Sequence, residues 1–265
     1  MADIDFNGYL RELNENNNVL KIKFDHTNVM YGGNKYSSST PNDLENKSNS
    51  AGNKINLNNN QNNDLISNNK SMQNSLDDFI ASGVDDNTRK LGQGERTAVI
   101  YSYKSAFNKL PETADEMADV IKIANGRFPS QTNEPAEKRA KDQFIKIYKR
   151  IPDMNDAKDA AAVKVMAYGL RQKAENRNLN SEKAGIKSFK SIFGNNPKTT
   201  QDWNAMQAIT YSGAVRKPDA DGDLLSDEME KKYGTDPNGS DTDKDGFKDG
   251  VEVNSGYNPK GSGKL

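Results

Sequence analysis

The chain has 265 residues, enough for one or two domains of ordinary size, but only 33% of them are hydrophobic. That fraction lies below the roughly 45–50% apolar content of globular domains, and the deficit is concentrated in the first third, which predicts a disordered part. The chain has no Cys and one His, His26. Disulfides, thiol metal sites and zinc sites are therefore not expected.

The formal net charge of −1 hides an uneven distribution. Residues 217–265 hold twelve Asp or Glu against seven Lys, a net charge of −5, and residues 1–216 carry the compensating +4. The local acidic excess is typical of cation-binding loops. The basic residues elsewhere form no dense run with interleaved aromatics, so we expect no nucleic-acid partner.

Membrane and export signals are not visible in the sequence. No stretch approaches the roughly 18 consecutive apolar residues of a membrane-spanning helix. The N-terminus lacks a basic segment followed by an apolar one. We therefore expect no membrane span in this chain, and an export signal either removed or of another type.

The N-terminal third is predicted to be an arm, residues 1–36, followed by a disordered Asn/Ser-rich linker, residues 37–88. Within the arm, Leu20 to Phe24 alternates apolar and polar residues as a half-buried strand does. A single strand is not stable alone. It must pair with a nearby strand, with the main body or with a partner chain.

From about residue 90 to 216 the pattern becomes helical and repeats three times. An aromatic-ended helix, a proline, a second apolar helix and a glycine recur in order. The prolines are Pro111, Pro152 and Pro197, and the glycines are Gly126, Gly169 and Gly213. Thr, Asn or Asp caps should open the second helices, and the glycines should adopt the left-handed conformation that ends them. We predict an all-α domain of three helical hairpins, each of about 43 residues.

The hairpins need one another because each has an apolar stripe. In the second copy, Ala140, Phe144, Ile147, Tyr148 and Ile151 fall on one helix face. Stacked hairpins would bury these stripes, and the recurring aromatics are interpreted as core residues rather than as a ligand pocket. The array and the N-terminal arm are the expected routes of self-assembly or of binding to protein partners.

No catalytic motif supports an enzyme. The chain lacks G-x-S-x-G, P-loop, H-E-x-x-H and Cys/His arrangements, so no catalytic residue is assigned. The acids Glu95, Glu137 and Glu182 recur at helix starts, and a remote alternative is a hydrolase that uses them. Their simpler explanation is a favourable charge at a helix N-terminus.

The strongest motif runs from Asp241 to Glu252. Calcium prefers six to eight oxygen ligands, and this loop supplies them at positions 1, 3, 5, 7, 9 and 12, with Gly246 at the sharp turn. The predicted ligands are Asp241, Asp243, Asp245, the carbonyl of Phe247, Asp249 and Glu252.

A second loop lies 22 residues upstream. The same positions are filled by Asp219, Asp221, Asp223, the carbonyl of Leu225, Asp227 and Glu230. Leu224 replaces the turn glycine, and a left-handed residue other than glycine costs about 1 kcal/mol or more. The sequence therefore predicts a first loop that is distorted or binds its ion less tightly.

These loops, with the intervening Gly234-Thr235-Asp236-Pro237 turn, resemble the bacterial thrombospondin type 3 repeat family over residues 219–262. The resemblance implies about two bound Ca²⁺ ions, with Asp236 as an additional ligand, and a secreted or surface-anchored protein. A sensor EF-hand is disfavoured, since only about seven residues separate Glu230 from Pro237 and leave no room for a long flanking helix.

The resulting expectation is a mainly α protein that ends in a calcium-bound tail, residues 217–265. The function expected is non-enzymatic: adhesion, presentation or assembly at the cell surface or outside the cell. The alternative is a carbohydrate- or wall-binding accessory module. Because clustered aspartates repel one another, calcium binding should supply much of the folding free energy of the tail.

Overall fold

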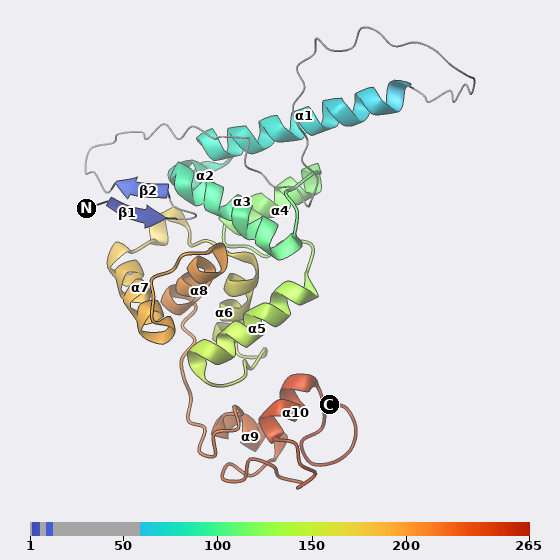
Figure 1. The fold of residues 1–265 in the computed structure, drawn as a ribbon, viewed down its shortest axis with the longest axis vertical. Coiled ribbons are helices and arrows are strands. Elements are labelled where there is room, and N and C mark those ends of the chain that lie inside the picture. The colour runs from blue at the N-terminus through green and yellow to red at the C-terminus, as the bar shows by residue number, and fades with distance from the viewer. Residues whose placement is uncertain (1, 6–8, 13–58) are drawn as a thin grey trace, which may run out of the picture.

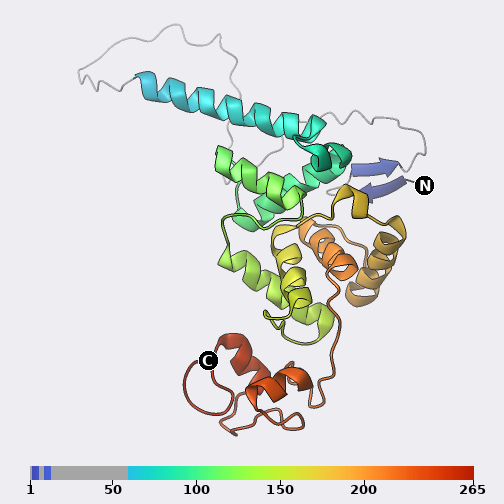
Figure 2. The same cartoon turned by 180° about the vertical axis from the view of Figure 1, so that it is seen from behind.

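A computed structural model describes residues 2–5, 9–12 and 59–265, with side chains from residue 70 onward. The protein is mainly helical, as predicted, and elongated, with α1 at one end and the C-terminal helices α9 and α10 at the other (Figures 1 and 2). None of the described helices is long and apolar enough to cross a membrane.

The N-terminal arm contains a short antiparallel pair, β1 (Ala2–Asp5) and β2 (Tyr9–Glu12), in which Ala2 lies opposite Glu12. This pair was not predicted. The strand expected at Leu20 to Phe24, and the predicted linker up to residue 58, lie outside the described residues.

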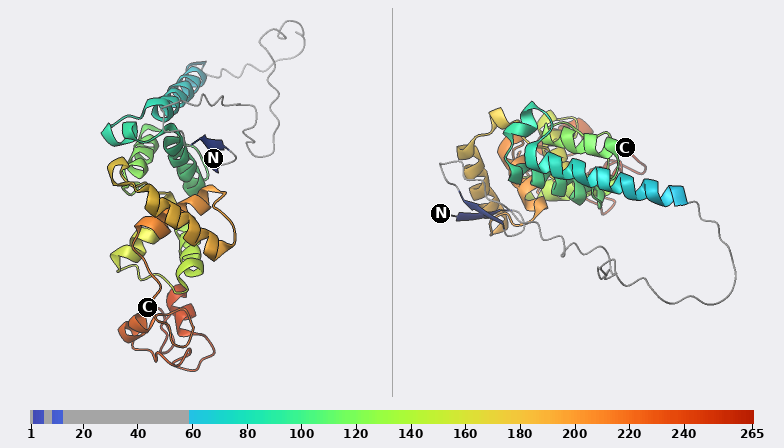
Figure 3. Two further views of the ribbon diagram at one scale, coloured as in Figure 1. Left: turned by 90° about the vertical axis from the view of Figure 1, so that its left-hand side faces the viewer. Right: turned by 90° about the horizontal axis from the view of Figure 1, so that it is seen from above.

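The prediction of a linker up to residue 88 is wrong in its last part. Helix α1 (Asn59–Ser82) and helix α2 (Asp86–Lys90) occupy residues 59–90, and α1 packs against α3. Figure 3 shows α1 lying across the end of the bundle. Leu76 and Phe79, one helical turn apart, are buried in the core, and the partly buried Met72 and Ile80 pack on the core from the same face of α1.

The buried Arg96 fixes the end of α1. Its guanidinium donates to the carbonyls of Ile80 (2.8 Å), Ala81 (2.8 Å) and Thr88 (3.1 Å), and also to that of Leu91. The last carbonyls of a helix have no partner within the helix. One side chain thus joins α1 and α2 to the first hairpin.

Residues 90–216 form the three predicted hairpins. The helices are α3 (Gln93–Phe107) with α4 (Ala114–Ala124), α5 (Glu134–Tyr148) with α6 (Ala157–Tyr168), and α7 (Leu179–Phe193) with α8 (Thr200–Tyr211). A short 3-10 turn, Ala174–Asn176, precedes α7. Helix α3 packs on both α6 and α8, so the hairpins share one core rather than forming an open solenoid.

The predicted signals at the helix ends are confirmed. Thr113, Asp156 and Thr199 cap the second helices through their side chains. The glycines that follow these helices all have left-handed φ angles: Gly126 (68°), Gly169 (69°) and Gly213 (75°).

The recurring aromatics belong to the core, as predicted. Each first helix carries an i, i+4 ring pair with centroids 4.4–4.6 Å apart: Tyr103–Phe107, Phe144–Tyr148 and Phe189–Phe193. The five residues of the predicted stripe in the second copy are all buried.

The tail holds two further seven-residue helices, α9 (Asp227–Tyr233) and α10 (Asp249–Ser255). Each follows one of the aspartate-rich loops and ends at a left-handed glycine, Gly234 or Gly256.

Candidate calcium centre

The two aspartate loops share one hydrogen-bond frame. In each loop, the carboxylate at position 1 accepts from the backbone N–H groups of positions 4 and 6. Each carboxylate at positions 3 and 5 accepts from the N–H two residues later. The position 1 bonds are Gly222 (2.9 Å) and Leu224 (3.1 Å) to Asp219, and Lys244 (2.8 Å) and Gly246 (3.0 Å) to Asp241. The first loop is therefore not distorted relative to the second.

Two positions in each loop, 4 and 6, are left-handed. The first loop has Gly222 (φ 73°) and Leu224 (82°), and the second has Lys244 (63°) and Gly246 (101°). Each loop thus places one glycine at one of the two positions where a side chain is disfavoured. The prediction considered only position 6, although the glycine at position 4 is visible in the sequence.

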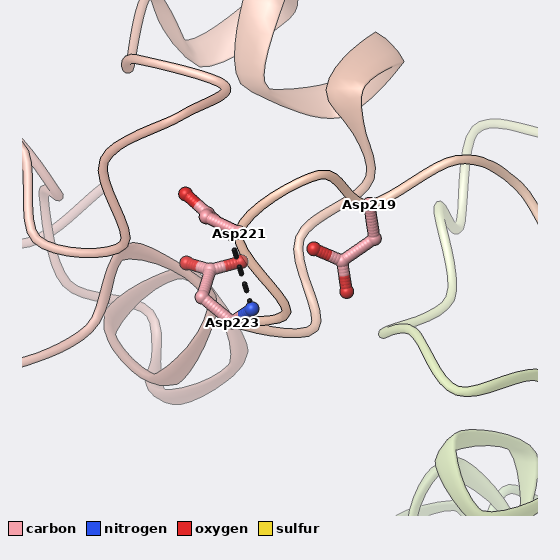
Figure 4. A group of neighbouring side chains, drawn as sticks. All are labelled: Asp219, Asp221 and Asp223. Carbon is pink, nitrogen blue, oxygen red and sulfur yellow. Dashed lines mark hydrogen bonds between the residues drawn. The ribbon is translucent and has the colours of Figure 1, made fainter.

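This frame gathers three carboxylates in each loop. Oxygens of Asp219, Asp221 and Asp223 lie within 4.8 Å of one another, as do oxygens of Asp241, Asp243 and Asp245. Figure 4 shows the first triad with the hydrogen bond of 3.2 Å from the Asp223 N–H to Asp221 Oδ1. Three carboxylates this close repel one another and offer the oxygen ligands that Ca²⁺ prefers.

The position 12 glutamates point to the same conclusion. Glu230 is fully buried, and neither of its carboxylate oxygens has a hydrogen-bond partner among the described residues. Glu252 Oε2 and Asp221 Oδ2 are also buried without a partner in this part of the chain. Burial, followed by repulsion from Asp221 and other nearby acids, raises the pKa of Glu230 to about 7. The pKa of Glu252 is also raised, first by burial and then by neighbouring aspartates. Buried, unpaired carboxylates of this kind fit a bound Ca²⁺.

The position 7 carbonyls are also available as ligands. Among the described residues, no group donates a hydrogen bond to the carbonyl oxygen of Leu225 or Phe247. Both oxygens are therefore free for a hard cation, which prefers such ligands.

The structure gives the remaining predicted ligands a second role. The position 9 carboxylates accept from the backbone of position 2: Ala220 donates to Asp227 (3.0 Å) and Thr242 to Asp249 (2.9 Å). Asp236 accepts from the Asn238 N–H (3.1 Å) in the turn between the repeats. Through these hydrogen bonds, Asp227, Asp249 and Asp236 stabilise the backbone conformation of the loops and of the turn between them.

The second repeat packs closely on the first. The Gly250 N–H donates to Asp223 Oδ2 at 2.7 Å, and a Cβ at Gly250 would lie 2.4 Å from the Asp223 carbonyl oxygen. A side chain is excluded there, and α10 therefore contacts a predicted ligand of the first loop.

The first loop is joined to the helical array. The Ile151 N–H donates to the Leu224 carbonyl at 2.8 Å, and Ile151, Leu225 and Met229 form a separate small apolar cluster. The half-buried Leu224 side chain packs on this cluster. Leu224 thus stands in place of the turn glycine and contributes to the junction, the contact between the first loop and the helical array. The loop pattern alone could not predict this contact.

The recurring glutamates at helix starts are engaged in structural pairs. Arg177 binds both Glu95 (3.0 Å) and Glu182 (2.8 Å). Glu137 pairs with Lys164 (2.5 Å) and accepts from the Tyr168 hydroxyl (2.7 Å). These contacts support a structural role, and nothing in this geometry favours the hydrolase alternative.

The tail thus consists of two tandem calcium-binding loop repeats, a structural module rather than a catalytic one. Residues 219–238 and 241–260 each match the bacterial TSP3 repeat, which confirms the resemblance. No curated protein and no solved structure matches the chain. The match covers the tail alone and says nothing about the helical array.

Proposed function

We propose that the protein is a non-enzymatic structural or adhesion protein of the cell surface or the extracellular space. TSP3 repeats are calcium-binding structural modules typical of extracellular proteins. The structural part of the proposal rests on Glu230, which is fully buried, has no hydrogen-bond partner among the described residues, and lies beside the aspartate triad of a loop joined to the helical array.

Calcium would fix the tail in place on the array. Asp219, Asp221, Asp223 and Glu230 would hold the ion, whose two positive charges would offset half of their four negative charges and so reduce the repulsion that opposes folding of the loop. The folded loop then presents Leu224 and Leu225 to Ile151. The helical domain would thus carry a rigid, calcium-dependent extension suited to assembly or presentation.

The helical array and the N-terminal arm would provide the contacts with protein partners or with further copies of the chain. This part of the proposal is supported by the modular order of the chain, in which a calcium-stabilised tail follows a domain that has its own core.

Limited proteolysis with and without a chelator tests the proposal. We expect two ions per chain by calorimetric titration, and cleavage after residue 217 that is fast in chelator and slow in calcium. The array should remain intact because its core does not depend on the loops. Equal digestion of the tail in both conditions would contradict a calcium-dependent tail.

A further inference from the structure

A cleft in the helical array has the features of a small-molecule site. Its volume is about 320 Å³, and it is lined by residues that follow α4, by residues of α6 and α8, and by the connection that leads to α7. Ala161, Val165 and Leu170 contribute apolar surface. Ligand sites combine such apolar surface with a few polar groups, and this volume is at the lower end of their range.

The polar group that needs an explanation is Gln207. This residue of α8 is only 7% exposed and lines the cleft. Its side-chain amide forms no hydrogen bond with any described residue, and its atoms are not sealed from solvent. Because these atoms are open to the cleft, water satisfies them in the free protein, and a ligand could replace that water with hydrogen bonds to the Gln207 amide.

The other polar groups define the character of the ligand. The side-chain amides of Gln172 and Asn176 and the ammonium of Lys173 also line the cleft. No carboxylate is among the lining residues in this part of the chain. The site therefore suits a neutral or anionic molecule that both donates and accepts hydrogen bonds.

An exposed aromatic ring completes the cleft. Phe128 lines it while remaining 58% exposed, unlike the buried aromatics of the hairpin repeats. The Lys164 ammonium lies 5.9 Å from the centre of this ring, a contact that favours a fixed ring orientation. An aromatic face with partial negative charge can stack against the C–H groups of a sugar.

We propose that this cleft binds an N-acetylated sugar. An acetamido group has one donor, one acceptor and a methyl group, which match the Gln207 amide and the neighbouring apolar surface. Sugar hydroxyls would pair with Gln172 and Asn176, and the ring would stack on Phe128. This inference goes beyond the calcium-dependent role of the tail, because none of these residues belongs to the calcium loops.

The test is titration of the calcium-loaded full chain with N-acetylglucosamine and its linear oligomers, followed by NMR and calorimetry. We expect saturable binding, with chemical-shift changes in α8 and in the connection before α7. Phe128→Ala and Gln207→Leu should each weaken binding at least about tenfold. Phe247→Ala, which removes an exposed aromatic of the tail, is the matched control and should bind as the wild type does.

Thermal unfolding of each variant separates a binding defect from a folding defect, and Phe128→Ala removes a side chain that is mostly exposed. The proposal is overturned if no sugar binds saturably, if a peptide with acetylated ends binds and the sugars do not, or if both variants bind normally. Calcium stoichiometry, measured on the same samples, reports on the proposed role of the tail independently of sugar binding.

Discussion

Equivalent residues of the two repeats have opposite environments. Leu225 and Met229 are 0% and 3% exposed in the junction with the array, whereas Phe247 and Val251, 22 residues later, are 61% and 47% exposed. The loop frame is the same in both repeats. Burial at these positions is therefore decided by whether the repeat contacts the helical domain.

This difference predicts that replacing these side chains by alanine changes the free energy of unfolding by unequal amounts. Leu225→Ala should lower the free energy of unfolding of the calcium-loaded tail by about 2–4 kcal/mol, because it opens a cavity in the junction. Phe247→Ala should change it by less than about 0.5 kcal/mol. Differential scanning calorimetry in excess calcium measures both effects, and similar losses for the two variants would contradict the assigned junction.

Glu230 makes calcium binding at the first loop sensitive to pH. Its pKa in the folded, ion-free protein is about 7, above the ordinary value, so the ion-free fold is favoured at low pH and loses stability as the pH rises and the buried carboxylate ionises. Calcium needs the ionised form. The stabilisation by calcium should therefore increase between about pH 5 and pH 8.

The measurement is calcium titration across this pH range, with a Glu230→Gln variant. We expect the variant to bind one ion tightly instead of two and to lose the steepest part of the pH dependence. A matched Glu228→Gln variant, which alters an exposed glutamate of the same helix, should behave as the wild type. Two tight ions in Glu230→Gln would remove Glu230 from the ligand set.

At the scale of elements, the contact between repeats is set by one glycine. Gly250→Ala would place a Cβ 2.4 Å from the Asp223 carbonyl oxygen and 3.0 Å from the Leu225 nitrogen, so α10 must move away from the first loop. In an open helix the same change would stabilise by about 0.5–1 kcal/mol. We expect destabilisation here, and weaker calcium binding at the first loop because Asp223 loses the Gly250 N–H.

Gly239→Ala is the control for this prediction. The three atoms nearest to a Cβ there all belong to the Asp236 side chain, at 3.2 Å or more, and this side chain can move. Calcium titration and thermal unfolding of both variants check the argument. A neutral or stabilising effect of Gly250→Ala would show that the repeats are not held at this contact.

The elements also show what the sequence could predict. The hairpins were predictable because proline, cap and glycine recur at fixed spacing, and the calcium loops because their ligands occupy fixed positions. Helix α1 was missed because the segment was interpreted from its Asn-rich composition, although Met72, Leu76, Phe79 and Ile80 recur at helical spacing and pack on the core. The role of Leu224 was missed because it depends on Ile151, a residue 73 positions earlier in the chain.

On the scale of the whole molecule, the junction links calcium binding in the tail to the position of the tail on the helical array. Ile151 is 3% exposed, lies in the junction cluster rather than in the main core, and contributes no predicted ligand. Ile151→Asp would bury an unpaired carboxylate beside an acidic tail, at a cost of several kcal/mol. We expect the tail to detach from the array while both loops still bind calcium.

Small-angle X-ray scattering distinguishes these states. The wild type should be more compact in calcium than in chelator, whereas Ile151→Asp in calcium should have the larger dimensions of the chelated wild type. Ile151→Val, which costs only about 0.5–1.5 kcal/mol, should keep the compact form. If Ile151→Asp stays compact with two ions bound, the tail is held to the array by other contacts, such as the 3.2 Å ion pair between Lys232 and Asp153.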